Sequence, residues 1–173
     1  ESGIERIGDL VVEQSRRPAQ WYFSARGFGP QGQLAIRPQA VSVEHLGNGR
    51  FKLITTWQAQ EPAPKDLNVF IHFTSDHSGR SDGIAFQSGG SPSPGTSQWT
   101  GTIRLGDNRI AQIPSQCRPG EYEILVGLWD PTTGRRYGLL GSDDGTTRYR
   151  LGTLVVEGTA EAIDSIRLVT TNV

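Results

Sequence analysis

Aromatic rings and arginines occur together at two places in the chain. One is "RRPAQWYFSAR", where the candidate binding residues are Trp21, Tyr22 and Arg26. The other is the turn-forming stretch "WDPTTGRRY", whose candidate residues are Trp129, Asp130, Arg135, Arg136 and Tyr137. The C–H face of a saccharide can stack on such rings, while guanidinium and carboxylate groups bond its hydroxyls. Because arginine also holds oxyanions with parallel hydrogen bonds, this chemistry suits an anionic polysaccharide or oligosaccharide.

Each stretch also has a purely structural interpretation. Trp21 would attach a long loop to the rest of the fold. In the second stretch, pairing of Arg136 with Asp130 would fix the turn. We expect Asp130 to accept backbone hydrogen bonds there, Pro131 to set φ, and Gly134 to take a positive φ. This local order explains the turn without a ligand, so the sequence leaves both interpretations open.

Catalytic chemistry has little support. The three histidines of the chain do not have the spacing of metal ligands. The run Asp76–Ser78 contains the residue types of a catalytic triad, but neighbours on one turn seldom meet in triad geometry. His72 lies in an apolar row and is expected to be a hydrogen-bonded core residue. We therefore expect no catalytic residues and no enzymatic activity from this chain by itself.

A cofactor is not expected either, with one alternative. Asp82 and the turn Asp143–Gly145 offer carboxylate and carbonyl oxygens, which are the ligands that calcium prefers. The composition of "GSDDGTTR" is equally that of a solvated turn. A structural calcium ion is thus the alternative to no metal.

Composition limits the classes of partner. The chain has 173 residues, a formal net charge of −1 and a single cysteine. It shows no concentrated basic face of the kind that tracks phosphates, so a nucleic-acid partner is not expected. No apolar run approaches the ~20 residues of a membrane span. The chain begins with Glu1 and contains no methionine, so we expect a module of a longer polypeptide whose other domains are its partners.

Alternation with period two predicts strands along most of the chain. The clearest case is "VSVEHLGNGRFKLITTW", which predicts strands at Val41–Leu46 and Arg50–Gln60 around the turn Gly47–Gly49. Trp57 falls on the apolar row of the second strand and is expected in the core. Further short strands follow at regular spacing, with turn residues between them. This pattern predicts an all-β fold, an antiparallel β-sandwich of the immunoglobulin-like type, with a jelly roll as the alternative.

Tyr122 supports the immunoglobulin-like alternative. It follows a Pro-Gly turn at the start of an alternating strand. A tyrosine at that position is typical of the tyrosine corner, in which its hydroxyl bonds to the backbone of the preceding connection. The only stretch with any helical character is "TAEAIDSI", near the C-terminus.

A repeated strand bears on the domain organisation. "ERIGDLVVE" at residues 5–13 aligns without a gap with "YRLGTLVVE" at residues 149–157. Either the chain begins with the last strand of a preceding copy of the module, or one domain carries two similar strands. We expect an N-terminal segment at 1–30, consisting of that strand and a linker loop, and the β-sandwich module at 31–158. The remainder, 159–173, is expected to be a C-terminal extension or linker.

Three pieces of the chain together resemble a known class of module. They are "VFIHF" at Val69–Phe73, "TSQW" at Thr96–Trp99, and "PGEYEILVGLWDPTTGRRYGLL" followed by "RYRLGTLVVE". They resemble the β-sandwich accessory modules of secreted bacterial carbohydrate-active enzymes, and similar extracytoplasmic domains of bacterial membrane glycosyltransferases. The resemblance covers roughly Val41 to Glu157, whereas residues 15–30 depart from the pattern. It assigns no ligand-binding residues.

The resemblance implies a function and a location. It implies a non-catalytic accessory module of a larger carbohydrate-processing protein, placed extracellularly or in the periplasm. Carbohydrate binding is the function that we expect. The alternative is a structural spacer or interdomain packing module with no ligand of its own.

Overall fold

The computed structural model describes residues 33–106, 110–159 and 162–170, and its regular elements are almost all strands. The first sheet contains β1 (Ile36–Gly47), β2 (Arg50–Ala59), β5 (Gly101–Leu105) and β6 (Ile110–Gln112). The second contains β3 (Asn68–Thr74), β4 (Ile84–Gly90), β7 (Gly120–Trp129), β8 (Arg136–Tyr137), β9 (Tyr149–Gly158) and β10 (Ile163–Val169). Every strand pair is antiparallel. The predicted antiparallel β-sandwich is confirmed.

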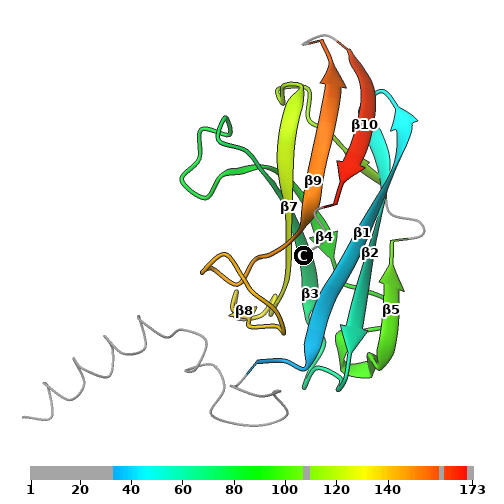
Figure 1. The fold of residues 1–173 in the computed structure, drawn as a ribbon. Coiled ribbons are helices and arrows are strands. Elements are labelled where there is room, and N and C mark those ends of the chain that lie inside the picture. The colour runs from blue at the N-terminus through cyan, green and yellow to red at the C-terminus, as the bar shows by residue number, and fades with distance from the viewer. Residues whose placement is uncertain (1–32, 107–109, 160–161, 171–173) are drawn as a thin grey trace, which may run out of the picture.

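The strand order is immunoglobulin-like. The first sheet runs β1-β2-β5, with β6 also paired to β2, and the second runs β10-β9-β7-β3-β4, with β8 paired to β7 (Figure 1). The chain therefore crosses between the sheets after β2, after β4 and before β7, as in Greek-key sandwiches. One short 3₁₀ turn, η2 (Thr96–Gln98), lies on the connection from β4 to β5.

The β1–β2 hairpin follows from local chemistry. Gly47, Asn48 and Gly49 have φ values of 93°, 53° and 71°, the left-handed conformation that the Gly-Asn-Gly sequence predicts. The alternating row on β2 then faces the core, where Trp57 is 0% exposed and its indole N–H donates to Thr55 Oγ1 at 3.0 Å. The prediction that Trp57 belongs to the core is confirmed.

Tyr122 forms the predicted tyrosine corner. Its ring is buried at the start of β7, and its hydroxyl donates to the carbonyl of Arg118 in the preceding connection. Phe86 of β4 meets the ring edge-on at a centroid distance of 5.4 Å. The corner thus ties β7 to the connection that precedes it.

The second sheet extends beyond residue 158. Residues 163–169 form β10, which pairs along β9 from Ile163 opposite Gly158 to Val169 opposite Thr153. The expectation of a C-terminal extension or linker from 159 is corrected for this part, and so is the helical character of the same stretch. The physical reason is tertiary: Ile166 is buried against the core cluster, and this burial favours an extended strand.

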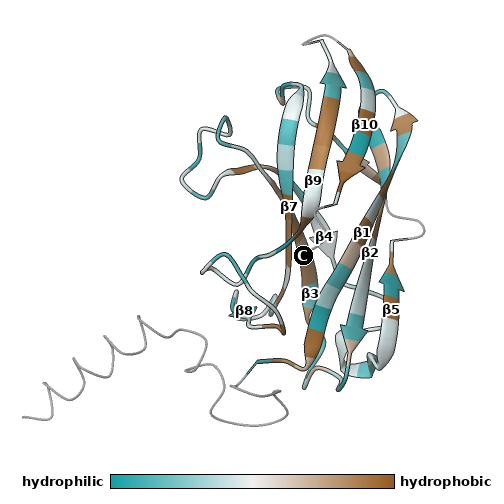
Figure 2. Ribbon diagram, in the orientation of Figure 1, coloured by the Kyte–Doolittle hydropathy of each residue, from teal (hydrophilic) through white to brown (hydrophobic). Residues whose placement is uncertain are grey.

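β3 lies in the middle of the second sheet, between β4 and β7. Val69, Ile71 and Phe73 point into the core cluster, while Phe70 and His72 point to the outer face. Both outward residues are nevertheless buried. In Figure 2 the hydrophobic colour runs along the strands, and the loops that project from this sheet are mostly hydrophilic. No helix in the described part of the chain is long and apolar enough to cross a membrane.

Candidate binding site

The turn between β7 and β8 is ordered by its own residues, as predicted. The Asp130 side chain accepts a hydrogen bond from the Thr132 backbone N–H at 2.8 Å. The Asp130 carbonyl accepts one from the Gly134 N–H at 2.8 Å, and Gly134 has a φ of 74°. This geometry explains why the turn contains Asp and Gly where it does.

The ion pair of Asp130 differs from the expectation. Its Oδ2 lies 2.6 Å from Nζ of Lys65, on the connection between β2 and β3, and not beside Arg136. The hydrogen bond from Lys65 holds the pKa of the buried Asp130 carboxyl below its ordinary value. The predicted pairing of Arg136 with Asp130 is therefore wrong. Both carboxylate oxygens of Asp130 are engaged within the protein.

Strand alternation separates the two aromatic residues of this hairpin. Trp129 is paired with Arg136, and Leu128 is paired with Tyr137. Leu128 faces the core, so Tyr137 packs against the core cluster while Trp129 and Arg136 share the outer face. Trp129 is half-buried, and Arg135 is exposed on the turn. Of the hairpin candidates, Trp129 and Arg136 are brought together, whereas Asp130, Arg135 and Tyr137 are directed elsewhere.

Trp129 and Arg136 line a shallow depression on the outer face of the second sheet, with a volume of about 400 Å³. Its polar lining includes the exposed Gln87 of β4; Ser88 also borders it but is opposite the core-facing Ile71, so its side chain is directed to the other face. The remaining lining residues come from β3, from the end of β4 and from the turn before β8: Val69, Phe70, His72, Gly89, Gly90 and Gly134. An aromatic ring and several hydrogen-bonding groups thus converge on one concave surface.

The floor of this depression is built in layers. Gly127 and Phe70 are directly opposite on β7 and β3, and a methyl group at position 127 would come within 2.3 Å of Phe70 Cζ. The ring of Phe70 therefore lies against bare backbone. Above it, the Arg136 guanidinium carbon lies 4.9 Å from the ring centroid, a cation–π contact. This stack holds Arg136 close to the sheet.

His72 lies beside this stack, and its ring centroid is 4.6 Å from that of Phe70. It is 4% exposed, and its Nδ1 atom has no hydrogen-bond partner among the described residues. The expectation of a fully hydrogen-bonded core histidine is therefore wrong for this nitrogen. Burial first, and then the nearby cations Arg136 and Arg148, lower the pKa of His72 to about 4. The imidazole is neutral at physiological pH.

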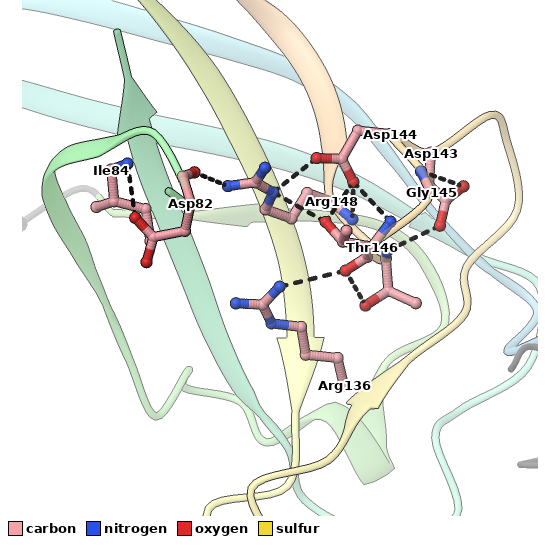
Figure 3. Close-up of polar contacts among 9 residues, drawn as sticks. Asp82, Ile84, Arg136, Asp143, Asp144, Gly145, Thr146 and Arg148 are labelled. Atoms are coloured by element: carbon pink, nitrogen blue, oxygen red, sulfur yellow. Dashed lines mark hydrogen bonds and ion pairs between the residues drawn. The ribbon is translucent and has the colours of Figure 1, made fainter. Parts of the chain in front are cut away.

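The loop before β9 covers part of the same outer face (Figure 3). Arg148 donates from Nε to Asp144 Oδ2 at 2.7 Å and from Nη1 to the carbonyl of Asp82 at 2.9 Å. It thereby joins this loop to the β3–β4 loop. Arg136 donates from Nη1 to the carbonyl of Thr146 at 3.2 Å. Arg136 thus reaches this loop from β8, whereas Arg148 belongs to the loop itself.

The carboxylates suggested as calcium ligands accept hydrogen bonds within the protein. Asp144 accepts from the Thr146 backbone and from Arg148, and Asp143 accepts from the backbone N–H of Gly145 and Thr147. Asp82 pairs with Arg80, which lowers the pKa of Asp82. Within the described ranges, no group of three or more acidic, histidine or cysteine side chains is arranged to hold a metal ion. These carboxylates order the loop that carries Arg148.

A larger, more polar cleft of about 1480 Å³ lies between the β3–β4 loop and the loop before β9. Both loops project to the same side of the sheet, to the left in Figure 1. Among its lining residues the only Phe, Tyr or Trp is Tyr122, whose ring is buried in the core. The cleft therefore offers no ring for stacking. His77 and Ser78 lie on its rim, and no hydrogen bond joins their side chains in this turn.

The N-terminal candidates Trp21, Tyr22 and Arg26 lie outside the described residues, as does the repeated strand at 5–13.

The depression also contains residues that were not predicted from the sequence, namely His72 and Gln87. Their positions opposite each other on β3 and β4 depend on strand pairing. The sequence signals for them were a histidine between apolar residues in β3 and two glycines at the end of β4.

Comparison with known proteins identified no family for this chain. Neither a protein-family model nor a curated protein sequence matches the chain. What the site does is therefore inferred from its own residues.

Proposed function

We propose that the chain is a non-catalytic accessory module that binds carbohydrate within a larger secreted bacterial carbohydrate-processing protein. Its partners are a polysaccharide or oligosaccharide and the other domains of the same polypeptide. Binding would hold a linked catalytic domain close to its substrate and raise the effective substrate concentration. An extracellular or periplasmic location follows from this role.

The observation that carries the proposal is the placement of Trp129. Its half-buried side chain lines a depression that also presents Gln87 and Arg136. An amphipathic ring held by a strand gives contact area to the C–H face of a sugar at a small cost in side-chain entropy. The polar groups beside it can exchange hydrogen bonds with sugar hydroxyls. Few ligands other than saccharides need this combination on a shallow, polar surface.

A second candidate function is a spacer or interdomain packing module without a ligand. It is favoured by the hydrogen bonds of the β7–β8 turn and by the Lys65–Asp130 ion pair, which account for those residues structurally. In that case Trp129 would contact a neighbouring domain. The two functions differ in whether the isolated chain retains a glycan.

Glycan-array screening and affinity gel electrophoresis of the whole chain separate the two functions. We expect retention by at least one polysaccharide, and Trp129→Ala should weaken it about tenfold or more. Trp129→Phe keeps a ring and should bind nearly as well, which makes it the matched control. Trp21→Ala tests the N-terminal stretch in the same assay. A folded wild-type chain that no glycan retains would establish the spacer instead.

A further inference from the structure

Arg136 is a half-buried cation that forms no ion pair with a carboxylate among the described residues. Within that part of the chain its guanidinium donates one hydrogen bond, to the Thr146 carbonyl, which leaves most of its N–H donors unused there. The ion pairs of the described chain join other cations to carboxylates: Lys65, Arg80, Arg148, Arg150 and Arg167. An exposed arginine in this situation is hydrated by water. A half-buried one has lost part of that hydration and gains more from an anion.

The surroundings of Arg136 hold its guanidinium in place and remove part of its hydration. The guanidinium is held over the ring of Phe70 at 4.9 Å, so its orientation is largely set before any ligand arrives. Burial first, and then the neighbouring Arg148 guanidinium, lower the pKa of Arg136, while Asp144 and Asp82 act in the opposite direction without reversing the shift. An anion placed beside Arg136 would relieve this repulsion.

An independent observation indicates a ligand at the same place. His72, 4% exposed, lines the depression that Arg136 and Trp129 line, and its Nδ1 atom has no partner among the described residues. A buried polar atom without a partner is uncommon in a native structure and requires an explanation. Because Nδ1 is itself shielded from solvent, His72 would donate to a ligand oxygen only after a small movement of the side chains around it, in the tautomer with a proton on Nδ1.

We propose that the depression recognises an acidic sugar residue, whose carboxylate or sulfate pairs with Arg136 while the sugar ring lies against Trp129. The planar fork of a guanidinium matches both oxyanions. Gln87 of β4, opposite the outward-facing His72, is placed for a hydroxyl of the same residue. This inference rests on the proposed function and adds to it the charge class of the sugar and the residue that selects it.

Isothermal titration of the whole chain with three probes tests the charge selection. The probes are an oligouronate, the same oligomer after reduction of its carboxyl groups, and a sulfated oligosaccharide. We expect the oligouronate or the sulfated oligosaccharide to bind about 10-fold or more tightly than the reduced, neutral oligomer. Binding of the acidic probe should weaken as the salt concentration is raised, because part of its attraction to the protein is ionic. The relative affinity of the uronate and sulfate probes identifies the source of the oxyanion.

Variants of the two adjacent arginines provide the matched control. Arg136→Gln should weaken binding of the acidic oligomer about 10- to 100-fold, whereas Arg135→Gln, on the exposed turn, should change it less than about 2-fold. Arg136→Lys retains the charge without the planar fork and should fall between them. Because Arg136 also packs on Phe70, the thermal midpoint of each variant is measured alongside. If Arg136→Gln fails to fold, the Nε–H signal of Arg136 in the wild-type NMR spectrum replaces it and should shift on titration.

Equal affinity for the acidic and reduced oligomers would overturn this inference while leaving the proposed function intact. The inference would also be overturned if the Arg136 NMR signal did not shift on titration with the acidic probe, or if a folded Arg136→Gln variant bound that probe as tightly as the wild type. Failure of every saccharide to bind the folded chain would overturn the proposed function itself. The two failures are therefore distinguishable in one set of titrations.

Discussion

Lys65 and Asp130 form a 2.6 Å ion pair between residues that lie 65 positions apart in the sequence. The pair links the loop between β2 and β3 to the β7–β8 turn, next to the depression that Trp129 lines. The Asp130 side chain is 4% exposed and that of Lys65 is 46% exposed, so the carboxylate depends on this partner more than the ammonium does. The pair fixes the end of β7 from which Trp129 projects.

The Lys65–Asp130 pair should make the fold sensitive to acid. The pKa of Asp130 is lower in the folded chain than its ordinary value of 3.8, so its contribution to stability is present above pH 3.8 and is lost as pH falls through the lowered value. Asp130→Asn keeps an acceptor for Thr132 but removes the charge, and should flatten this acid-dependent loss. Thermal midpoints measured between pH 5 and pH 2 check it. Asp76→Asn, on the exposed β3–β4 turn, is the control; an acid slope unchanged by Asp130→Asn would contradict the prediction.

His72 should produce a separate pH dependence. Its pKa is about 4 in the folded chain and 6.5 in its ordinary state, because of burial first and then Arg136 and Arg148. Between these values the unfolded chain binds a proton that the folded chain does not, so stability falls as pH decreases from 6.5 to about 4 and levels off below. Asp82 and Asp144 act in the opposite direction and limit the effect.

The measurement is chemical denaturation of the wild type and of His72→Gln across this pH range. His72→Gln should lose most of the slope, while His77→Gln, on the exposed turn, should keep it. Parallel curves for the wild type and His72→Gln would show that His72 does not titrate in this window.

Position 127 must be glycine because the ring of Phe70 packs directly against its backbone. Gly127→Ala should destabilise the fold by about 1–3 kcal/mol, because the added methyl would stand within 2.3 Å of Phe70 Cζ. Urea denaturation provides the value. The double variant Phe70→Leu with Gly127→Ala removes the two clashing ring atoms, Cζ and Cε1, and should cost less than the sum of the single changes. The Thr147 carbonyl oxygen, 2.9 Å from the added methyl, retains part of the cost. Strict additivity would count against this contact.

Trp57 is expected to contribute as a core residue. It is 0% exposed, and its ring centroid lies 5.6 Å from that of Trp99. Trp57→Ala should therefore cost about 3–5 kcal/mol of unfolding free energy, the range for emptying a large aromatic site. Denaturant midpoints measure it, and a change too small to detect with an unaltered slope would refute the core assignment.

The repeated strand at residues 5–13 lies outside the described residues, so its role stays a prediction. Its counterpart, β9, is already paired on one side with β7 and on the other with β10. A second copy therefore has no place at that position of the sheet. If residues 5–13 belong to a preceding copy of the module, deletion of residues 1–13 should leave the thermal midpoint within about 2 °C. Loss of cooperative unfolding would instead show an integrated strand.

The features that could be predicted from the sequence are those that neighbours along the chain decide. The turn Gly47–Gly49 needs positive φ values, and glycine and asparagine supply them. Trp57 lies on an alternating row, and Tyr122 follows a Pro-Gly turn at a strand start. The β7–β8 turn is likewise made by Asp130 and Gly134 within its own span. Short-range steric and hydrogen-bonding preferences are enough in each case.

The candidate site could be predicted only in part, for a physical reason. The sequence placed Trp129 beside two arginines, but which arginine shares its face depended on the pairing of β8 with β7. A shift of one residue in that pairing would have put Arg135 opposite Trp129, in the depression, and Arg136 opposite the core-facing Leu128.

Contacts between distant parts of the chain were decided by the tertiary structure alone. Lys65 meets Asp130, Phe70 lies on Gly127, and β10 adds to the sheet because folding brings separate strands into one register. Several cations could satisfy Asp130 equally well by charge, so residue type does not choose among them. Strand pairing and burial of the core make that choice, because they determine which side chains can reach one another.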